Sequence, residues 1–180
     1  MTNTPDLIPD PSTFVADSTY WLQAAQAAVR RECGWHVAPS YTHTVKLNAF
    51  GGSRLALPTL HVTDISSFKL EGVEHVQDIA YGSSGLVQLR HGVLLPDMPG
   101  SVEVTMTDGY APEEVPDVIA VMLAASKRGS MASGVVKTQS VNGSTVTYVT
   151  GSEPLGIPLF ESEKRTLAKY KLPHIVGAKQ

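Results

Sequence analysis

The sequence predicts an α+β fold in which a small helical scaffold of about three helices carries a large antiparallel β insertion, like a sandwich or barrel. Two changes of pattern lead to this prediction. Apolar residues follow a helical period up to Cys33 and again after Gly109, whereas over residues 42–108 they alternate with period two, as in strands. In addition, Asn142-Gly143 separates two alternating segments, which predicts a β-hairpin between the last two helices.

This pattern divides the 180 residues into parts. Residues 1–16 contain three prolines among polar residues and are expected to form a flexible N-terminal arm. Residues 17–41 and 109–172 are expected to form the helical core, which includes the hairpin at 135–150. Residues 42–108 are the β insertion, and residues 173–180 are expected to form a C-terminal arm.

The first helix is expected to begin at Asp17 or Ser18, because either side chain can cap a helix, and to end before Gly34. Trp35 and His36 follow this glycine. An aromatic residue in this place usually closes the last helical turn, and we favour that interpretation over a ligand-stacking pair.

The second helix is expected over about Pro116 to Arg128. Its residues 118–125 are apolar on all sides, and a helix without a polar face is buried, either at the centre of the monomer or between monomers. The hub of the scaffold should therefore include Val118, Val121, Met122 and Leu123. The last helix, over about Pro158 to Tyr170, is expected to turn three apolar side chains inward, those of Phe160, Leu167 and Tyr170.

Short strands with regular turn signals fill the insertion. Residues 42–48 and 54–58 flank Gly51-Gly52 and are predicted to form a hairpin. Further strands are expected at 62–72, 76–81, 85–90 and 102–107, separated by glycine turns and by the segment 96–100. About six strands with a turn roughly every ten residues are typical of a small sandwich or barrel.

Composition argues against several functions. The net charge of −3 and the pI near 6.0 argue against a dedicated nucleic-acid binder, and they leave room for local basic clusters at Arg30-Arg31, Lys127-Arg128 and Lys164-Arg165. Cys33 is the single cysteine, so an intrachain disulfide or a multi-thiolate metal site is excluded, and a reducing compartment is expected. The sequence shows neither a signal-peptide pattern nor an apolar run long enough for a transmembrane helix.

No motif for catalysis is evident. The six histidines form no zinc-binding motif, and the glycine pairs are not followed by the Lys-Ser/Thr of a phosphate loop, so we expect no cofactor, no metal and no enzyme activity. Acidic residues of the β segment could pair as the acid and base of a glycosidase, although solvated strand ends and turns explain them better. These residues are Asp64, Glu71, Asp78, Asp97, Glu103 and Asp108.

Five motifs follow one another along the chain. They are Cys33-Gly34-Trp35-His36-Val37-Ala38-Pro39-Ser40 at a helix end, Leu55-Ala56-Leu57-Pro58, Gly109-Tyr110-Ala111-Pro112 before a helix, Ser140-Val141-Asn142-Gly143-Ser144-Thr145-Val146-Thr147-Tyr148, and a closing helix with Leu167 and Tyr170. In order and spacing they resemble the head-to-tail adaptor (connector) proteins of tailed bacteriophages, those of phages that infect actinobacteria in particular. The resemblance covers about residues 17–172.

The resemblance implies a non-enzymatic virion protein at the head-tail interface, assembled in the bacterial host cytoplasm. It implies a homo-oligomeric ring, expected to have twelve copies, that lies below the portal protein, extends the DNA channel and docks a head-tail stopper or tail protein. Double-stranded DNA would pass without specific binding, and no membrane would be involved. The hairpin would contact a neighbouring subunit through Thr138, Val141, Asn142, Gly143, Thr145 and Tyr148, and the C-terminal segment would contact the portal through Leu172, Pro173, His174, Ile175 and Val176.

Two alternatives remain open at this point. A stopper or tail-completion protein of the same virion would differ mainly in having more β-structure and little helical scaffold. A glycan-binding β module would account for the insertion, but it would not account for the apolar helix or the hairpin.

Overall fold

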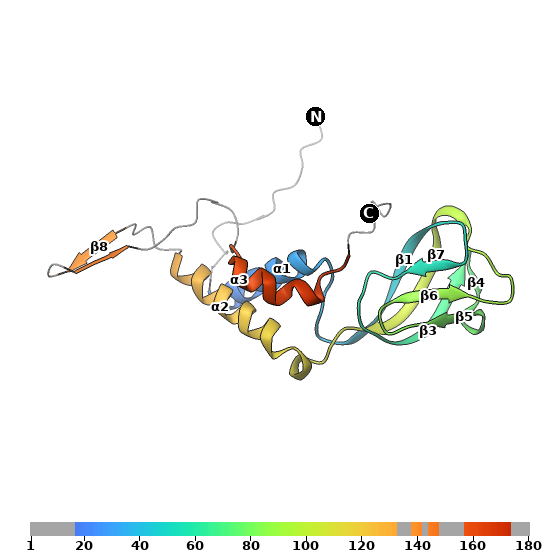
Figure 1. Cartoon of the computed structure of the whole chain (residues 1–180), viewed down its shortest axis with the longest axis horizontal. Coiled ribbons are helices and arrows are strands. Elements are labelled where there is room, and N and C mark those ends of the chain that lie inside the picture. The colour runs from blue at the N-terminus through green and yellow to red at the C-terminus, as the bar shows by residue number, and fades with distance from the viewer. Residues whose placement is uncertain (1–16, 133–137, 142–143, 148–156, 174–180) are drawn as a thin grey trace, which may run out of the picture.

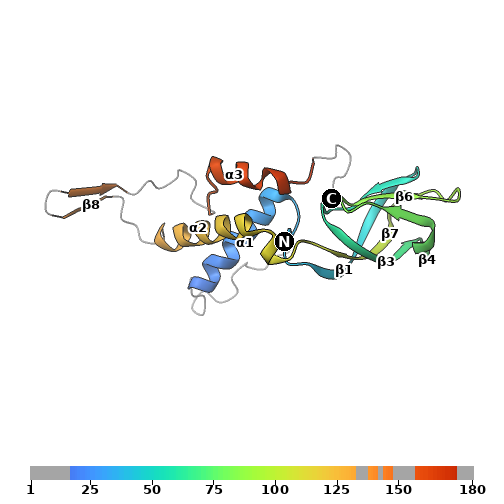
Figure 2. The same cartoon turned by 60° about the horizontal axis from the view of Figure 1, so that its bottom comes forward.

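The computed structural model describes residues 17–132, 138–141, 144–147 and 157–173. Figures 1 and 2 show a helical body in the middle, a β lobe on one side of it and a small hairpin on the other. The described chain contains three α-helices, a four-stranded and a three-stranded antiparallel sheet, and a two-stranded hairpin. The α+β fold predicted from the sequence is therefore confirmed.

Helix α1 spans Ser18–Cys33, as its capping residues predict. The Asp17 carboxylate accepts a hydrogen bond from the backbone N–H of Tyr20 at 2.8 Å and so satisfies one free donor of the first turn. Gly34 ends the helix in the left-handed region, at φ 81°, where its N–H donates to the Arg30 carbonyl. Both predicted ends are confirmed.

Helix α2 spans Pro116–Ala132 and packs along α1. Val118, Val121 and Ala125 are buried on one side of it, whereas Leu123, on the other side, is 55% exposed. The monomer therefore does not bury this helix all round, which was one of the two positions that the sequence allowed, and the other, burial between monomers, stays a prediction. Among the described residues, α1 and α3 are the helices that pack on α2, and both contact it from the Val121 side, so these helices do not cover its opposite face.

Helix α3 spans Glu161–Leu167 and continues as the short 3-10 helix η3, Ala168–Tyr170. Leu167 and Tyr170 are buried as predicted, but Phe160 is 54% exposed, so its predicted inward position is wrong. The ring of Phe160 lies against the Arg128 guanidinium of α2, 4.1 Å from the ring centroid. The same guanidinium binds both carboxylate oxygens of Glu163, at 2.8 and 2.7 Å, and this cation holds Phe160 at the surface.

The β lobe consists of two antiparallel sheets that share one apolar core. The first sheet has the order β1-β7-β3-β4 and the second has the order β2-β6-β5. Their strands are β1 (Tyr41–Phe50), β2 (Arg54–Ala56), β3 (Val62–Leu70), β4 (Val73–Glu74), β5 (Ile79–Tyr81), β6 (Leu86–Leu89) and β7 (Asp97–Asp108). Two 3-10 turns, η1 (Val76–Asp78) and η2 (Pro112–Glu114), precede β5 and α2.

The predicted hairpin of residues 42–48 and 54–58 is wrong. β1 pairs with β7, from Tyr41 opposite Asp108 to Phe50 opposite Asp97, and β2 pairs with β6 in the other sheet. Gly51 and Gly52, at φ 72° and 83°, therefore turn the chain from one sheet into the other. Residues 96–100, expected to separate strands, instead belong largely to β7, which begins at Asp97 and contains a bulge opposite residues 47–49.

The predicted hairpin between α2 and α3 is confirmed. β8 (Thr138–Val141) pairs antiparallel with β9 (Ser144–Thr147), and Figure 1 shows this pair apart from the helical body. Its predicted contact residues Asn142, Gly143 and Tyr148 lie outside the described residues, as do residues 1–16 and His174, Ile175 and Val176 at the two ends.

Candidate functional site

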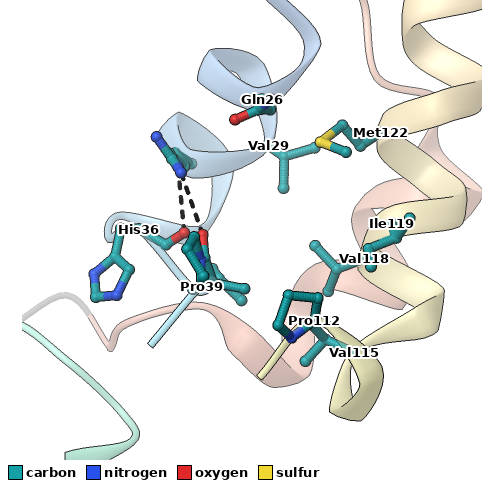
Figure 3. Close-up of a pocket in the computed structure, with 12 residues that line it drawn as sticks. Gln26, Val29, His36, Pro39, Pro112, Val115, Val118, Ile119 and Met122 are labelled. Atoms are coloured by element: carbon teal, nitrogen blue, oxygen red, sulfur yellow. Dashed lines mark hydrogen bonds between the residues drawn. The ribbon is translucent and has the colours of Figure 1, made fainter. Parts of the chain in front are cut away.

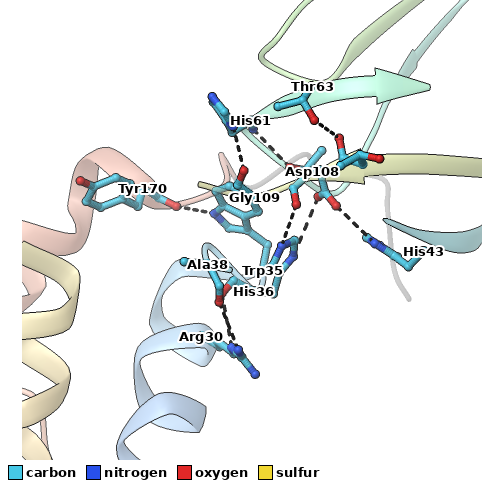
Figure 4. A network of polar contacts seen from close by, with 12 residues as sticks. Arg30, Trp35, His36, Ala38, His43, His61, Thr63, Asp108, Gly109 and Tyr170 are labelled. Atoms are coloured by element: carbon cyan, nitrogen blue, oxygen red, sulfur yellow. Dashed lines mark hydrogen bonds and ion pairs between the residues drawn. The ribbon is translucent and has the colours of Figure 1, made fainter. Parts of the chain in front are cut away.

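The chain passes between the helical body and the β lobe twice, through residues 34–41 and again through residues 108–115. The two passages lie side by side, because the Tyr110 N–H donates a hydrogen bond to the Val37 carbonyl at 2.8 Å. Figure 4 shows the polar contacts that gather here, which we call the junction: Trp35, His36, His43, His61, Asp108 and Gly109.

Asp108 is the buried charge of the junction. It is the last residue of β7 and continues the alternation of inward-facing residues that Val102, Val104 and Met106 begin. Its side chain is only 1% exposed. One carboxylate oxygen lies 3.3 Å from His43 Nδ1, and the other lies 3.9 Å from His36 Nδ1. A buried carboxylate needs such partners to offset the loss of water.

The sequence interpretation did not identify this grouping. The sequence offered one signal for this site, an acidic residue that continues the series of inward-facing residues along a strand. Its contact with His43 depends on the register of β1 against β7, and its contact with His36 depends on how the two passages meet. Burial lowers the pKa of His36, an effect that the nearby Asp108 carboxylate opposes.

Among the described residues, no group of three or more histidines, cysteines or acids is arranged to hold a metal ion.

Gly109 allows the two passages to meet. Its φ is 100°, and a Cβ atom there would lie 2.5 Å from His36 Nε2 and 2.8 Å from the Pro39 carbonyl oxygen. Its N–H donates to the His61 carbonyl at 2.9 Å, and its own carbonyl lies 2.9 Å from His61 Nδ1. A larger residue at position 109 would therefore push the passages apart.

Trp35 belongs to the core of the helical body. It is buried, and its indole Nε1–H donates to the Tyr170 carbonyl at 2.6 Å. This geometry confirms that Trp35 closes the end of α1, and it leaves no exposed face on which a ligand could stack. The contact also ties the end of η3 to the end of α1, beside the junction.

A groove opens between α1, the first passage and α2 (Figure 3). Its volume is about 180 Å³, and its lining is largely apolar. The Arg30 guanidinium lies at its edge, where it donates to the His36 and Ala38 carbonyls at 3.3 and 3.2 Å. Among the described residues that line the groove, Arg30 and His36 are the ones that can carry a charge, and none is a carboxylate.

The predicted hub residues have three different positions. Val118 and Val121 are buried in the helical core, Met122 lines the groove, and Leu123 faces solvent. Leu123 belongs to an exposed stripe of α2, which we call the outer stripe: Ala120, Leu123, Ala124, Lys127 and Met131. These positions recur at three- and four-residue intervals, so they share one side of the helix.

The start of the predicted C-terminal contact segment is part of the monomer. The Leu172 N–H donates to the Cys33 carbonyl at 2.9 Å, and its side chain packs on the helical core near Gly34. Pro173 is exposed and is the last residue that the structure describes.

Within the described part of the chain, no helix is long and apolar enough to cross a membrane.

Comparison with known proteins finds similarity in structure alone. No protein-family model matches the chain, and no curated protein sequence matches it. A chain from the neck of a native gene transfer agent particle, computed with C12 symmetry, is 15% identical with a TM-score of 0.60, and the match covers 92% of this chain and 87% of that one. At this identity the likeness shows a shared fold over nearly the full length of both chains.

Two further structures agree with the first. A chain from the neck of an empty gene transfer agent particle, computed with C6 symmetry, is 20% identical with a TM-score of 0.53, covering 93% of this chain and 87% of that one. A chain from the virion of the native particle is 17% identical with a TM-score of 0.53, covering 96% and 87%. Chains in these neck and virion structures of gene transfer agent particles therefore share the fold of this protein over nearly its full length.

Proposed function

We propose that this protein is a structural, non-enzymatic neck component of a phage-like virion, and more narrowly a head-to-tail adaptor that forms a ring below the portal. The observation that carries the proposal is the fold shared over 92% of the chain with a neck protein from a particle computed with C12 symmetry. We therefore expect twelve copies in the ring. The helical body formed by α1, α2 and α3 favours an adaptor over a stopper, which we expect to have little helical scaffold.

The outer stripe of α2 is suited to contact between subunits. It exposes Leu123 and Met131 beside two alanines, and Lys127 is its only charged residue. Small and apolar side chains let a neighbouring surface approach closely and release water on contact. Such a contact would explain why residues 118–125 of α2 are apolar on all sides although the monomer buries only one side of the helix.

The hairpin β8–β9 supports the same assembly. An isolated two-stranded hairpin is marginally stable in water, and its outer edges can pair with another chain. We propose that Thr138, Val141, Thr145 and the residues around them contact a neighbouring subunit. The C-terminal segment beyond Leu172 would contact the portal, and the opposite face of the ring would receive the stopper or tail protein.

The charge of the chain fits a channel through which DNA passes. A net charge of −3 leaves no excess of cations to hold phosphates, so the ring would let double-stranded DNA pass without binding it. The protein would reside at the head-tail interface of the virion.

Mass measurement tests the proposal. We expect the full chain, alone or mixed with the portal protein of the same particle, to form a closed ring whose mass is a multiple of the 19.2 kDa subunit. Leu123→Asp should leave the fold intact and prevent the ring. Leu94→Asp is a matched control, because Leu94 is 64% exposed but lies in the β lobe. A chain that stays monomeric under both conditions would refute the ring.

A further inference from the structure

We propose that residues 6–13, in the N-terminal segment of the same molecule, bind in the groove between α1 and α2. The groove and this segment match in charge, in apolar character and in distance. The inference does not rest on the proposed ring, because the groove and its occupant belong to one chain.

The groove presents an apolar floor with a cation at its edge. Val29, Val115 and Val118 are buried at its base, and Ile119 and Met122 form its half-buried wall on α2 (Figure 3). Apolar surface that is open to water favours an occupant that covers it. The Arg30 guanidinium is held in place by two carbonyls, and it has further N–H donors that an incoming carboxylate can accept from.

The N-terminal segment has the complementary chemistry. It contains Asp6 and Asp10 and no lysine or arginine, and Leu7-Ile8 lies between the two acids. Pro9 and Pro11 fix φ and favour an extended chain, so binding costs less conformational entropy than for an ordinary segment. The C-terminal segment fits less well, because it carries Lys179 and no acidic side chain beside its apolar pair.

The distances allow this segment to fold back along α1. Gln26, at the near end of the groove, lies nine residues after Asp17, or about 13 Å along the helix, and Arg30 lies about 20 Å along it. An extended chain covers 20 Å in about six residues. Leu7 and Ile8 can therefore reach the floor with several residues to spare, and a short tether gives the segment a high effective concentration at its own groove.

Methyl resonances of the full chain provide the test. Removal of residues 1–13 should shift the methyl signals of Ile119 and Met122 and leave the Leu123 methyl signals, on the outer stripe, unchanged. The double substitution Leu7→Asp and Ile8→Asp should reproduce the shift without affecting the fold, since it alters only the segment. Thr2→Asp is the control, because it adds a negative charge outside residues 6–13.

Two results would overturn the inference. The first is that the signals of Ile119 and Met122 are unchanged by the truncation. The second is that the shift disappears on dilution of the full chain, which would show that the occupant comes from another copy. A synthetic peptide of residues 2–15, added to the truncated chain, should restore the original signals. The mass of the truncated chain with and without portal tests ring formation separately, so failure of one proposal is distinguishable from failure of the other.

Discussion

Gly109→Ala should destabilise the protein by separating the two passages of the junction. The new Cβ atom would lie 2.5 Å from His36 Nε2 and 2.8 Å from the Pro39 carbonyl oxygen. The imidazole cannot easily move away, because it lies edge-on to Trp35 and Tyr41 and beside the buried Asp108. The Pro39 oxygen belongs to the backbone and can move only with the passage itself.

Two costs add up at this position. An L-residue with positive φ costs about 1 to 2 kcal/mol. Insertion of a methyl group into a packed site costs a further 1 to 3 kcal/mol, roughly. The free energy of unfolding should therefore fall by about 2 to 5 kcal/mol. Gly92→Ala is a matched control, since Gly92 has φ 76° and a methyl group added there would have nothing within 4 Å, so this variant should show only the first cost.

Urea denaturation measures both variants. Tryptophan fluorescence reports on the junction through the buried Trp35, and circular dichroism follows the helices in the same samples. Gly109→Ala should lose at least about 1 kcal/mol more than Gly92→Ala. Equal losses would show that the close contacts around Gly109 relax at no cost and that the junction is not a tightly packed connection.

Two further predictions concern the core and the pH. Val121→Asp buries a carboxylate without a partner and should lower the free energy of unfolding by about 3 to 5 kcal/mol. Leu123→Asp, at an exposed position, should change the free energy of unfolding by less than about 0.5 kcal/mol. Similar urea midpoints for the two variants would contradict the orientation of α2. Because burial in the folded protein lowers the pKa of His36 from its ordinary 6.5, protonation of this residue favours the unfolded chain. Stability should therefore be full well above pH 6.5 and decrease as the pH falls below 6.5, and the decrease should be smaller in His36→Gln. Equal decreases in the two proteins would disprove this origin.

Local interactions made the helix ends predictable. Asp17 and Gly34 act on residues within four positions of themselves, so their roles can be identified from the chain alone. The hairpin β8–β9 was likewise marked by the two residues between its strands.

Non-local choices were not predictable in the same way. Gly51-Gly52 is compatible with a hairpin, but β1 pairs with a strand that begins 47 residues after the end of β1, which no local signal indicates. The exposure of Leu123 could not be predicted from the sequence for another reason. When every side of a helix is apolar, the pattern cannot select the face that packs, and the positions of α1 and α3 decide it. The contact of Asp108 with His43 depends on the same unpredicted strand register, and its contact with His36 depends on the meeting of the two passages.

The hydrogen bond between Val37 and Tyr110 also has a consequence for how such proteins diversify. Because the chain leaves the helical body and returns to it at adjacent points, the ends of the β lobe are already joined. The lobe could be exchanged for a different one, or shortened to a loop, without changing the spacing of α1 and α2. Proteins built on this body can therefore keep the packing of their helices while the β lobe changes in size and chemistry.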